Sequence, residues 1–102
     1  MAELTYLLEV RCEVTVGGLL PRGVTARIAD VEGRHQFVQV TSGMINRWGE
    51  QDYLPVGIVE IDRRKRRVLV ELPTEADSGV HRLWVRFDDL RKEATEEAEA
   101  VA

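Results

Sequence analysis

Residues 56–73 read VGIVEIDRRKRRVLVELP, where five consecutive basic residues separate two runs rich in Val, Ile and Leu. Runs of this composition favour β-strands, and the polar interruption between them favours a hairpin turn. Centring the turn on the middle of the basic run places Asp62 opposite Arg67 and Val59 opposite Val70, so that the apolar residues share one face. The remaining pairs in this register are Ile61 with Val68, Glu60 with Leu69, Ile58 with Glu71 and Gly57 with Leu72.

The segment VHRLWVRF, residues 80–87, continues the pattern as a third strand. One register against the second strand matches apolar residues on the core face and also gives favourable pairs on the outer face. Its pairs are Val70 with Leu83, Val68 with Val85, Glu71 with Arg82, and Leu69 with Trp84. Because a slip of one residue would turn every side chain to the other face, this agreement predicts a three-strand meander over residues 56–87.

Residues 4–16 alternate apolar and polar side chains, with Glu9, Arg11 and Glu13 all on the polar face, which predicts a long half-buried strand. Two shorter alternating runs on either side of Gly33 predict a hairpin. Together with the meander, these segments predict an antiparallel all-β domain of five or six strands. A small barrel or sandwich, SH3-like in size, is the architecture that such short strands favour.

The stretch SGMINRWGEQDYLP, residues 42–55, has little periodicity, two glycines and a closing proline. It therefore predicts a loop that is longer than most connections in compact domains. We expect the rings of Trp48 and Tyr53 to fold down as a lid over an open end of the barrel. The alternative is that they belong to a binding loop.

The last residues change composition. We predict one antiparallel β domain over residues 1–90 and an acidic tail rich in Ala and Glu over residues 91–102. Asp88 is placed to cap a short helix that frays into a disordered end. Residues 88–102 hold six acidic residues against two basic ones, which equals the net charge of -4 of the whole chain, so the rest of the chain is neutral. A neutral body offers no general attraction for nucleic acid.

The N-terminus lacks a basic leader, and its apolar residues are interrupted by charges, so neither a signal peptide nor a membrane span is predicted. Cys12 is the sole cysteine, which excludes an intramolecular disulfide and suits a reducing compartment. These observations predict a cytoplasmic protein that does not bind membranes. On the core face of the first strand, Cys12 itself is expected to be a small buried hydrophobe and not a nucleophile.

Motifs for catalysis are lacking. The two histidines, His35 and His81, are not spaced as a metal-binding pair, and the common phosphate, dinucleotide, acyl-transfer and zinc-protease motifs are absent. The segment EADSGVH, residues 75–81, gathers side chains that suit a metal or a weak nucleophile, but turn chemistry explains each of them. We therefore predict no enzymatic activity, no cofactor and no metal site.

Two surfaces remain as candidates for binding. The first, which we call the Trp84 face, is the outer face of the predicted meander. Its predicted binding residues are Ile58, Leu69, Arg82, Trp84 and Arg86. A Trp flanked by Arg on a mixed face is typical of protein interfaces, so the leading hypothesis is non-catalytic binding of another protein or of a second copy. The alternative is that a loop or the C-terminal helix covers this face.

The second surface, which we call the basic tip, consists of Arg63, Arg64, Lys65 and Arg66. It predicts, as the less favoured function, weak and sequence-independent contact with the phosphates of nucleic acid. The alternative is a solvated hairpin end that discourages aggregation through strand edges. No aromatic residues alternate with these bases to stack on nucleotides, which favours the solvated end.

Overall fold

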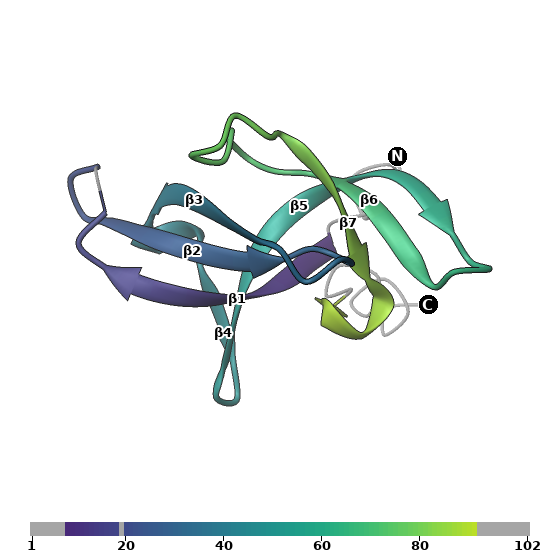
Figure 1. The fold of residues 1–102 in the computed structure, drawn as a ribbon. Coiled ribbons are helices and arrows are strands. Elements are labelled where there is room, and N and C mark those ends of the chain that lie inside the picture. The colour runs from purple at the N-terminus through teal and green to yellow at the C-terminus, as the bar shows by residue number, and fades with distance from the viewer. Residues whose placement is uncertain (1–7, 19, 92–102) are drawn as a thin grey trace, which may run out of the picture.

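A computed structural model describes residues 8–18 and 20–91, and it shows an antiparallel all-β fold (Figure 1). The predicted fold class is confirmed: one antiparallel sheet curls into a half-barrel, and the described residues contain no α-helix. The strands are β1 (Leu8–Val16), β2 (Gly23–Ala29), β3 (His35–Thr41), β4 (Asn46–Trp48), β5 (Gln51–Asp62), β6 (Arg67–Glu71), β7 (Arg82–Arg86) and β8 (Leu90–Arg91). Two short 3-10 helices are η2 (Ser42–Met44) and η3 (Phe87–Asp89).

The strand order is β3-β2-β1-β5-β6-β7, while β4 pairs with β5 and β8 pairs with β1. The inward side chains of the long strands form one hydrophobic cluster, in which Val10, Ile28, Val38, Leu54 and Val85 are completely buried. Each such aliphatic side chain contributes roughly 1.5–3 kcal/mol relative to an exposed position. The apolar positions of the alternating sequence pattern are therefore the positions that form this core.

Backbone hydrogen bonds hold the two ends of the curled sheet together. Val38 of β3 forms an isolated bridge with Ala76, and the Asp77 amide donates to the Phe37 carbonyl at 2.8 Å. At the turn of the β2–β3 hairpin, the Val31 amide donates to the Trp84 carbonyl at 3.0 Å. The β2–β3 hairpin therefore lies against the segment before β7 and against β7 itself.

The register predicted from residues 56–87 is confirmed near the turn and throughout the third strand. Asp62 lies opposite Arg67, and Ile61 and Glu60 follow in the predicted order against β6. The β6–β7 pairs are the predicted ones, including Val70 with Leu83 and Leu69 with Trp84. The hairpin predicted around Gly33 is likewise formed by β2 and β3.

A β-bulge at Val59 changes the other half of β5. Ile58 lies opposite Val70 and Gly57 lies opposite Glu71, so the predicted pairs of Val59, Ile58 and Gly57 are wrong by one residue. A bulge sets two residues against one on the partner strand, and it bends the strand. Val59 is consequently 39% exposed instead of joining the core, while Ile58 packs against the core.

The long loop predicted over residues 42–55 is wrong. This stretch forms η2 and then a hairpin of β4 and β5, which turns at Gly49 with φ at 63°. Trp48 is 42% exposed, so it does not form the predicted lid, and Tyr53 is half-buried within β5. The hairpin projects from the body of the sheet in Figure 1.

The helix predicted to begin at Asp88 is also wrong within the described residues. Phe87–Asp89 form a single 3-10 turn without a side-chain cap, and the chain then enters β8, which pairs with β1. Arg91, the first residue of the predicted tail, is thus part of the sheet. The rest of that tail, residues 92–102, and the predicted strand residues 4–7 lie outside the described residues.

Glu9 is the clearest exception to the alternation of β1. Although it was predicted on the polar face, it is 3% exposed, because β4 and β8 flank it. Asn46 Nδ2 donates to Oε2 of Glu9, and the Arg91 guanidinium lies 3.5 Å from Oε1. Arg91 also stacks on the Trp48 ring, 3.4 Å from its centroid. We call Glu9, Asn46, Trp48 and Arg91 the Glu9 clasp.

Because Glu9 is buried in the clasp, we expect its replacement to lower the free energy of unfolding strongly. Replacing Glu9 with Ala removes the buried carboxylate of the Glu9–Arg91 ion pair, and breaking a buried ion pair costs about 3–5 kcal/mol. Urea denaturation of the Glu9→Ala variant should show this loss in the free energy of unfolding. Glu50→Ala is the control, because Glu50 is exposed in the β4–β5 turn and its loss should change stability by less than about 0.5 kcal/mol. Equal stability of the two variants would contradict a role for the clasp.

Candidate functional site

The Trp84 face lies on the outer side of β6 and β7. Leu69 and Trp84 are directly opposite each other and both are half-buried. The guanidinium carbon of Arg67 lies 4.4 Å from the centroid of the Trp84 ring, and Arg67 also pairs with Asp62 at 3.4 Å. The indole of Trp84 therefore lies at the centre of this face, with the Arg67 guanidinium held over its ring.

Four of the five residues predicted for the Trp84 face share this side of the sheet. Arg82 and Arg86 lie two positions before and after Trp84, and the alternation of β7 points all three outward. Arg82 pairs with Glu71 across the strands at 3.1 Å. Ile58 does not belong to this group, because the bulge places it opposite Val70 and against the core.

A hollow of about 310 Å³ adjoins Trp84, and we call it the Trp84 hollow. Trp84, Arg67 and Arg82 line it from the meander, and the turn between β2 and β3 lines it from the other side with Asp30 and Arg34. The Asp30 carboxylate accepts from the amides of Glu32 and Arg34, both at 2.9 Å, which fixes this turn. The segment beside Trp84 is thus the β2–β3 turn, and the indole remains partly exposed.

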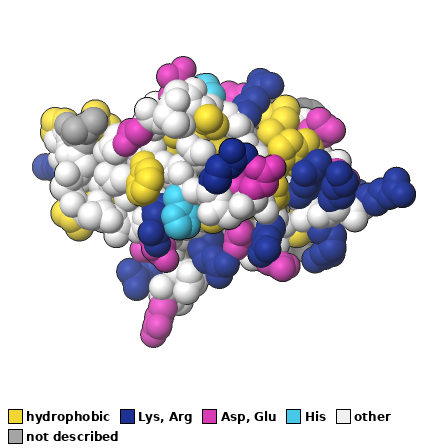
Figure 2. Space-filling view, viewed as in Figure 1, with side chains coloured by type: hydrophobic (Ala, Val, Ile, Leu, Met, Phe, Trp, Pro, Cys, Tyr) yellow, Lys and Arg dark blue, Asp and Glu magenta, His cyan; other side chains and the backbone are white. Residues whose placement is uncertain are grey.

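The basic tip is a four-residue turn whose side chains are all exposed. The Lys65 amide donates to the Asp62 carboxylate at 3.1 Å, and Arg66 adopts a positive φ of 53° to close the turn. Figure 2 shows Lys and Arg side chains gathered at the end of the molecule where the β5–β6 hairpin projects. The hairpin therefore presents Arg63, Arg64 and Lys65 together to solvent.

Two aromatic rings lie at the base of the basic tip, a feature that the sequence analysis missed. The Arg66 guanidinium lies over Phe87 at 5.2 Å and 3.7 Å from Asp88, while Arg67 lies over Trp84. The basic tip and the Trp84 face are consequently one continuous surface. The β6–β7 register contains the signal for this, because it sets Arg67 two positions from Leu69, the partner of Trp84, on the same face of β6.

The residues considered for catalysis or metal binding have structural partners. His81 Nε2 lies 2.9 Å from the Leu72 carbonyl, and Ser78 donates its hydroxyl to the Gln36 side chain at 2.7 Å. Gly79 has φ at 93°, as expected of a polar turn. Within residues 8–18 and 20–91, no three His, Cys, Asp or Glu side chains gather into a group that can hold a metal ion. The same part of the chain contains no helix long and apolar enough to cross a membrane.

Cys12 is a buried free thiol of the core, between the apolar side chains of β1. Burial, with a smaller contribution from the Asp52 carboxylate, raises the pKa of this thiol from 9.0 to about 12. The nucleophilic form of cysteine is the thiolate, which a raised pKa disfavours. The expected role of Cys12 as a small buried hydrophobe therefore agrees with its surroundings.

The fold and these surfaces define a small antiparallel β domain with an aromatic and cationic outer face. Comparisons with known protein families, with curated proteins and with solved structures find no match to this chain. We therefore infer function from the chemistry of the described side chains.

The raised pKa of Cys12 predicts a pH dependence of stability. A raised pKa in the folded state means that the stabilising effect of the neutral thiol is complete below pH 9.0, the unfolded value, and is lost as the pH rises towards about 12. We expect the free energy of unfolding to fall over this window, and to fall less steeply in the Cys12→Ala variant. Urea denaturation at several pH values measures both slopes, and parallel curves for the two proteins would refute the prediction.

Proposed function

We propose that this chain is a non-catalytic cytoplasmic domain that binds another protein, or a second copy of itself, through the Trp84 face. The observation that carries the proposal is the partly exposed indole of Trp84 beside a hollow of about 310 Å³. Trp and Arg are among the residue types most enriched in the few positions that dominate binding energy at protein interfaces.

The chemistry of the face supports a partner side chain that enters the Trp84 hollow. Leu69 and Trp84 supply apolar area, and the Arg82–Glu71 pair forms a polar rim beside it. Arg34 and Arg67 border the hollow on its two sides, and both are paired with acids: Arg34 with Asp30 and Glu32, and Arg67 with Asp62. A partner with both an apolar anchor and polar groups around it would match this arrangement.

The first test compares the Trp84→Ala variant with the unaltered chain in light scattering and in affinity capture from native lysate, with and without nuclease. Loss of an interface anchor costs about 2 kcal/mol or more, or roughly a 30-fold loss of affinity, so the partner or the dimer should be lost. Phe37→Ala is the matched control, because Phe37 is an aromatic residue with 43% exposure that lies on β3, away from this face.

Thermal unfolding of both variants checks that each remains folded, and Arg82→Glu tests the same face without removing apolar area. Placing Glu beside Glu71 introduces repulsion at the rim, so binding should weaken here too. A strictly monomeric chain that captures nothing, or equal binding by the Trp84 and Phe37 variants, would end this proposal.

A second candidate function is weak binding of nucleic acid through the basic tip. The specific support is that Arg63, Arg64 and Lys65 are exposed together and that Phe87 and Trp84 lie at their base. Cationic side chains that bind phosphates beside rings that stack on bases are the usual means of holding single strands. The ion pair of Arg66 with Asp88 reduces the charge that the tip offers.

This function predicts a characteristic dependence on salt. With about three to four phosphate contacts, the slope of log K against log salt concentration should be near -3 on duplex DNA. Titrations of labelled single-stranded RNA and duplex DNA at several salt concentrations measure it. Replacing Arg64 and Lys65 by Ala should abolish binding, whereas a control with Arg22→Asn and Arg47→Ala removes two other exposed charges and should retain it.

A shortened chain that ends at Arg91 extends the test, because it keeps the Glu9 clasp and removes four acidic residues. These acids oppose phosphate, so genuine binding should become tighter. Binding that the Arg64 and Lys65 replacements leave unchanged, or no binding by either length of chain, would identify the tip as a solvated hairpin end.

A further inference from the structure

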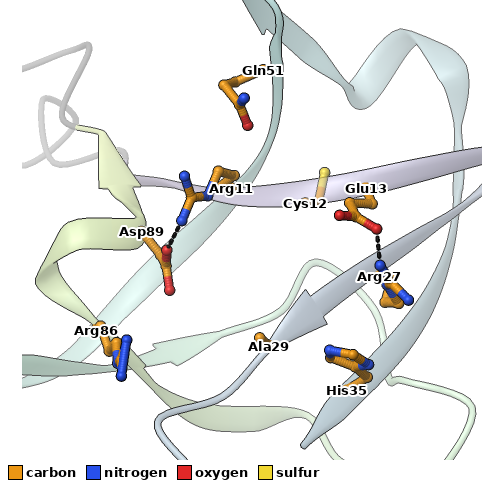
Figure 3. A pocket seen from close by; sticks show the side chains of 9 residues that line it. All are labelled: Arg11, Cys12, Glu13, Arg27, Ala29, His35, Gln51, Arg86 and Asp89. Carbon is orange, nitrogen blue, oxygen red and sulfur yellow. Dashed lines mark hydrogen bonds and ion pairs between the residues drawn. The ribbon is translucent and has the colours of Figure 1, made fainter. Parts of the chain in front are cut away.

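A second hollow, of about 390 Å³, does not include Trp84 in its lining, although it shares Arg86 with the Trp84 face, and we call it the arginine hollow. Its charged side chains and its one histidine are Arg11, Glu13, Arg27, His35, Arg86 and Asp89. Figure 3 shows the Arg11–Asp89 and Glu13–Arg27 ion pairs on opposite sides of the space, with Arg86 and His35 below them. Side chains from five separate segments therefore converge on one polar cavity.

The sheet itself explains why these charges converge. Arg11 and Glu13 are two positions apart and lie on the same face of β1, and Glu13 is paired directly with Arg27 of β2. Two positions after Arg27, the small side chain of Ala29 leaves open space above the strand. Arg86, at the end of β7, and η3 provide the facing wall.

The charges of the arginine hollow do not cancel. Three guanidinium groups face two carboxylates, and each carboxylate is already paired with one arginine, Asp89 with Arg11 and Glu13 with Arg27. Within the described part of the chain, the guanidinium of Arg86 forms neither a hydrogen bond nor an ion pair. It therefore retains its five N–H donors in a fixed planar fork.

We propose that the arginine hollow binds the oxyanion head group of a small organic anion, a carboxylate or a phosphate. Arg86 binds the head group through two parallel N–H donors, which is the geometry that guanidinium offers to both groups. Arg11 and Arg27 remain in their ion pairs and contribute positive potential. The volume of 390 Å³ falls within the range of about 300–1,000 Å³ that is typical of small-molecule sites, so it also accommodates the body of the ligand.

The two kinds of head group differ in how well their charge matches the site. With His35 neutral, the six groups carry a net charge of one positive unit, which a carboxylate balances. A phosphate dianion exceeds this charge by one unit, so the carboxylate matches the site more closely.

The test is an NMR titration of the full-length chain with sodium acetate and, separately, with sodium phosphate, each compared with sodium chloride at equal ionic strength. The expected result is a saturable shift of the amides of Ala29, His35 and Arg86 with at least one of the two oxyanions. The Arg86→Ala variant should lose roughly tenfold or more in affinity, because it removes charge-assisted hydrogen bonds. The saturation curves of acetate and phosphate, compared at one pH, show which of the two head groups the hollow binds more tightly.

Ala29→Leu blocks the hollow without altering a charge, and it should also abolish binding. Because Ala29 is not part of the Trp84 face, this variant separates the two proposals: loss of oxyanion binding with intact partner binding supports a separate site. Arg22→Asn is the matched control, since Arg22 lies at the other end of β2 and asparagine tolerates its φ of 56°.

Three results would overturn the proposal of an oxyanion site. Shifts that increase linearly to the highest concentration, or that chloride reproduces, would show charge screening alone. Saturable binding that neither Arg86→Ala nor Ala29→Leu weakens would place the anion elsewhere on the molecule.

Discussion

The double pairing of β6 is the constraint on which the rest of the meander depends. Five residues, Arg67–Glu71, pair with β5 on one side and with β7 on the other. Val68 and Val70 face the core in both ladders, so a slip in either would expose buried valines and bury charges. The same alternation sets Arg67 beside the turn and over Trp84. Core and candidate binding surface are thus two faces of one short strand.

The sequence predicts those parts of the fold that depend on residues close to one another along the chain. The β6–β7 register was predictable because both faces of the strands agree on it. The bulge at Val59 was not, since apolar residues stand on both sides of it and regular pairing looks equally good in the sequence. The buried position of Glu9 depends on Asn46 and Arg91, partners 37 and 82 positions away, which strand periodicity cannot reveal.

The candidate surfaces illustrate the same limit. The composition of residues 56–87 predicted both the exposed turn and the outward Trp84, and the structure agrees with these placements. That the two form one surface follows from guanidinium groups lying over rings, Arg66 on Phe87 and Arg67 on Trp84. The arginine hollow was beyond prediction, because its residues come from strands whose curvature brings them together. Sequence periodicity indicates which side of a strand a residue faces, but it does not indicate how the sheet bends.

The pairing of β8 with β1 has a topological consequence. Glu9 and Arg91 are neighbours across a ladder, so the described fold begins and ends at the same place in the sheet. A domain with adjacent ends can be inserted into a loop of another chain without separating the flanking strands of its host. For the same reason the chain can be circularly permuted, with the new N- and C-termini placed in the exposed turn at Gly49. The β1–β8 pairing therefore makes the described fold suited to insertion into another chain.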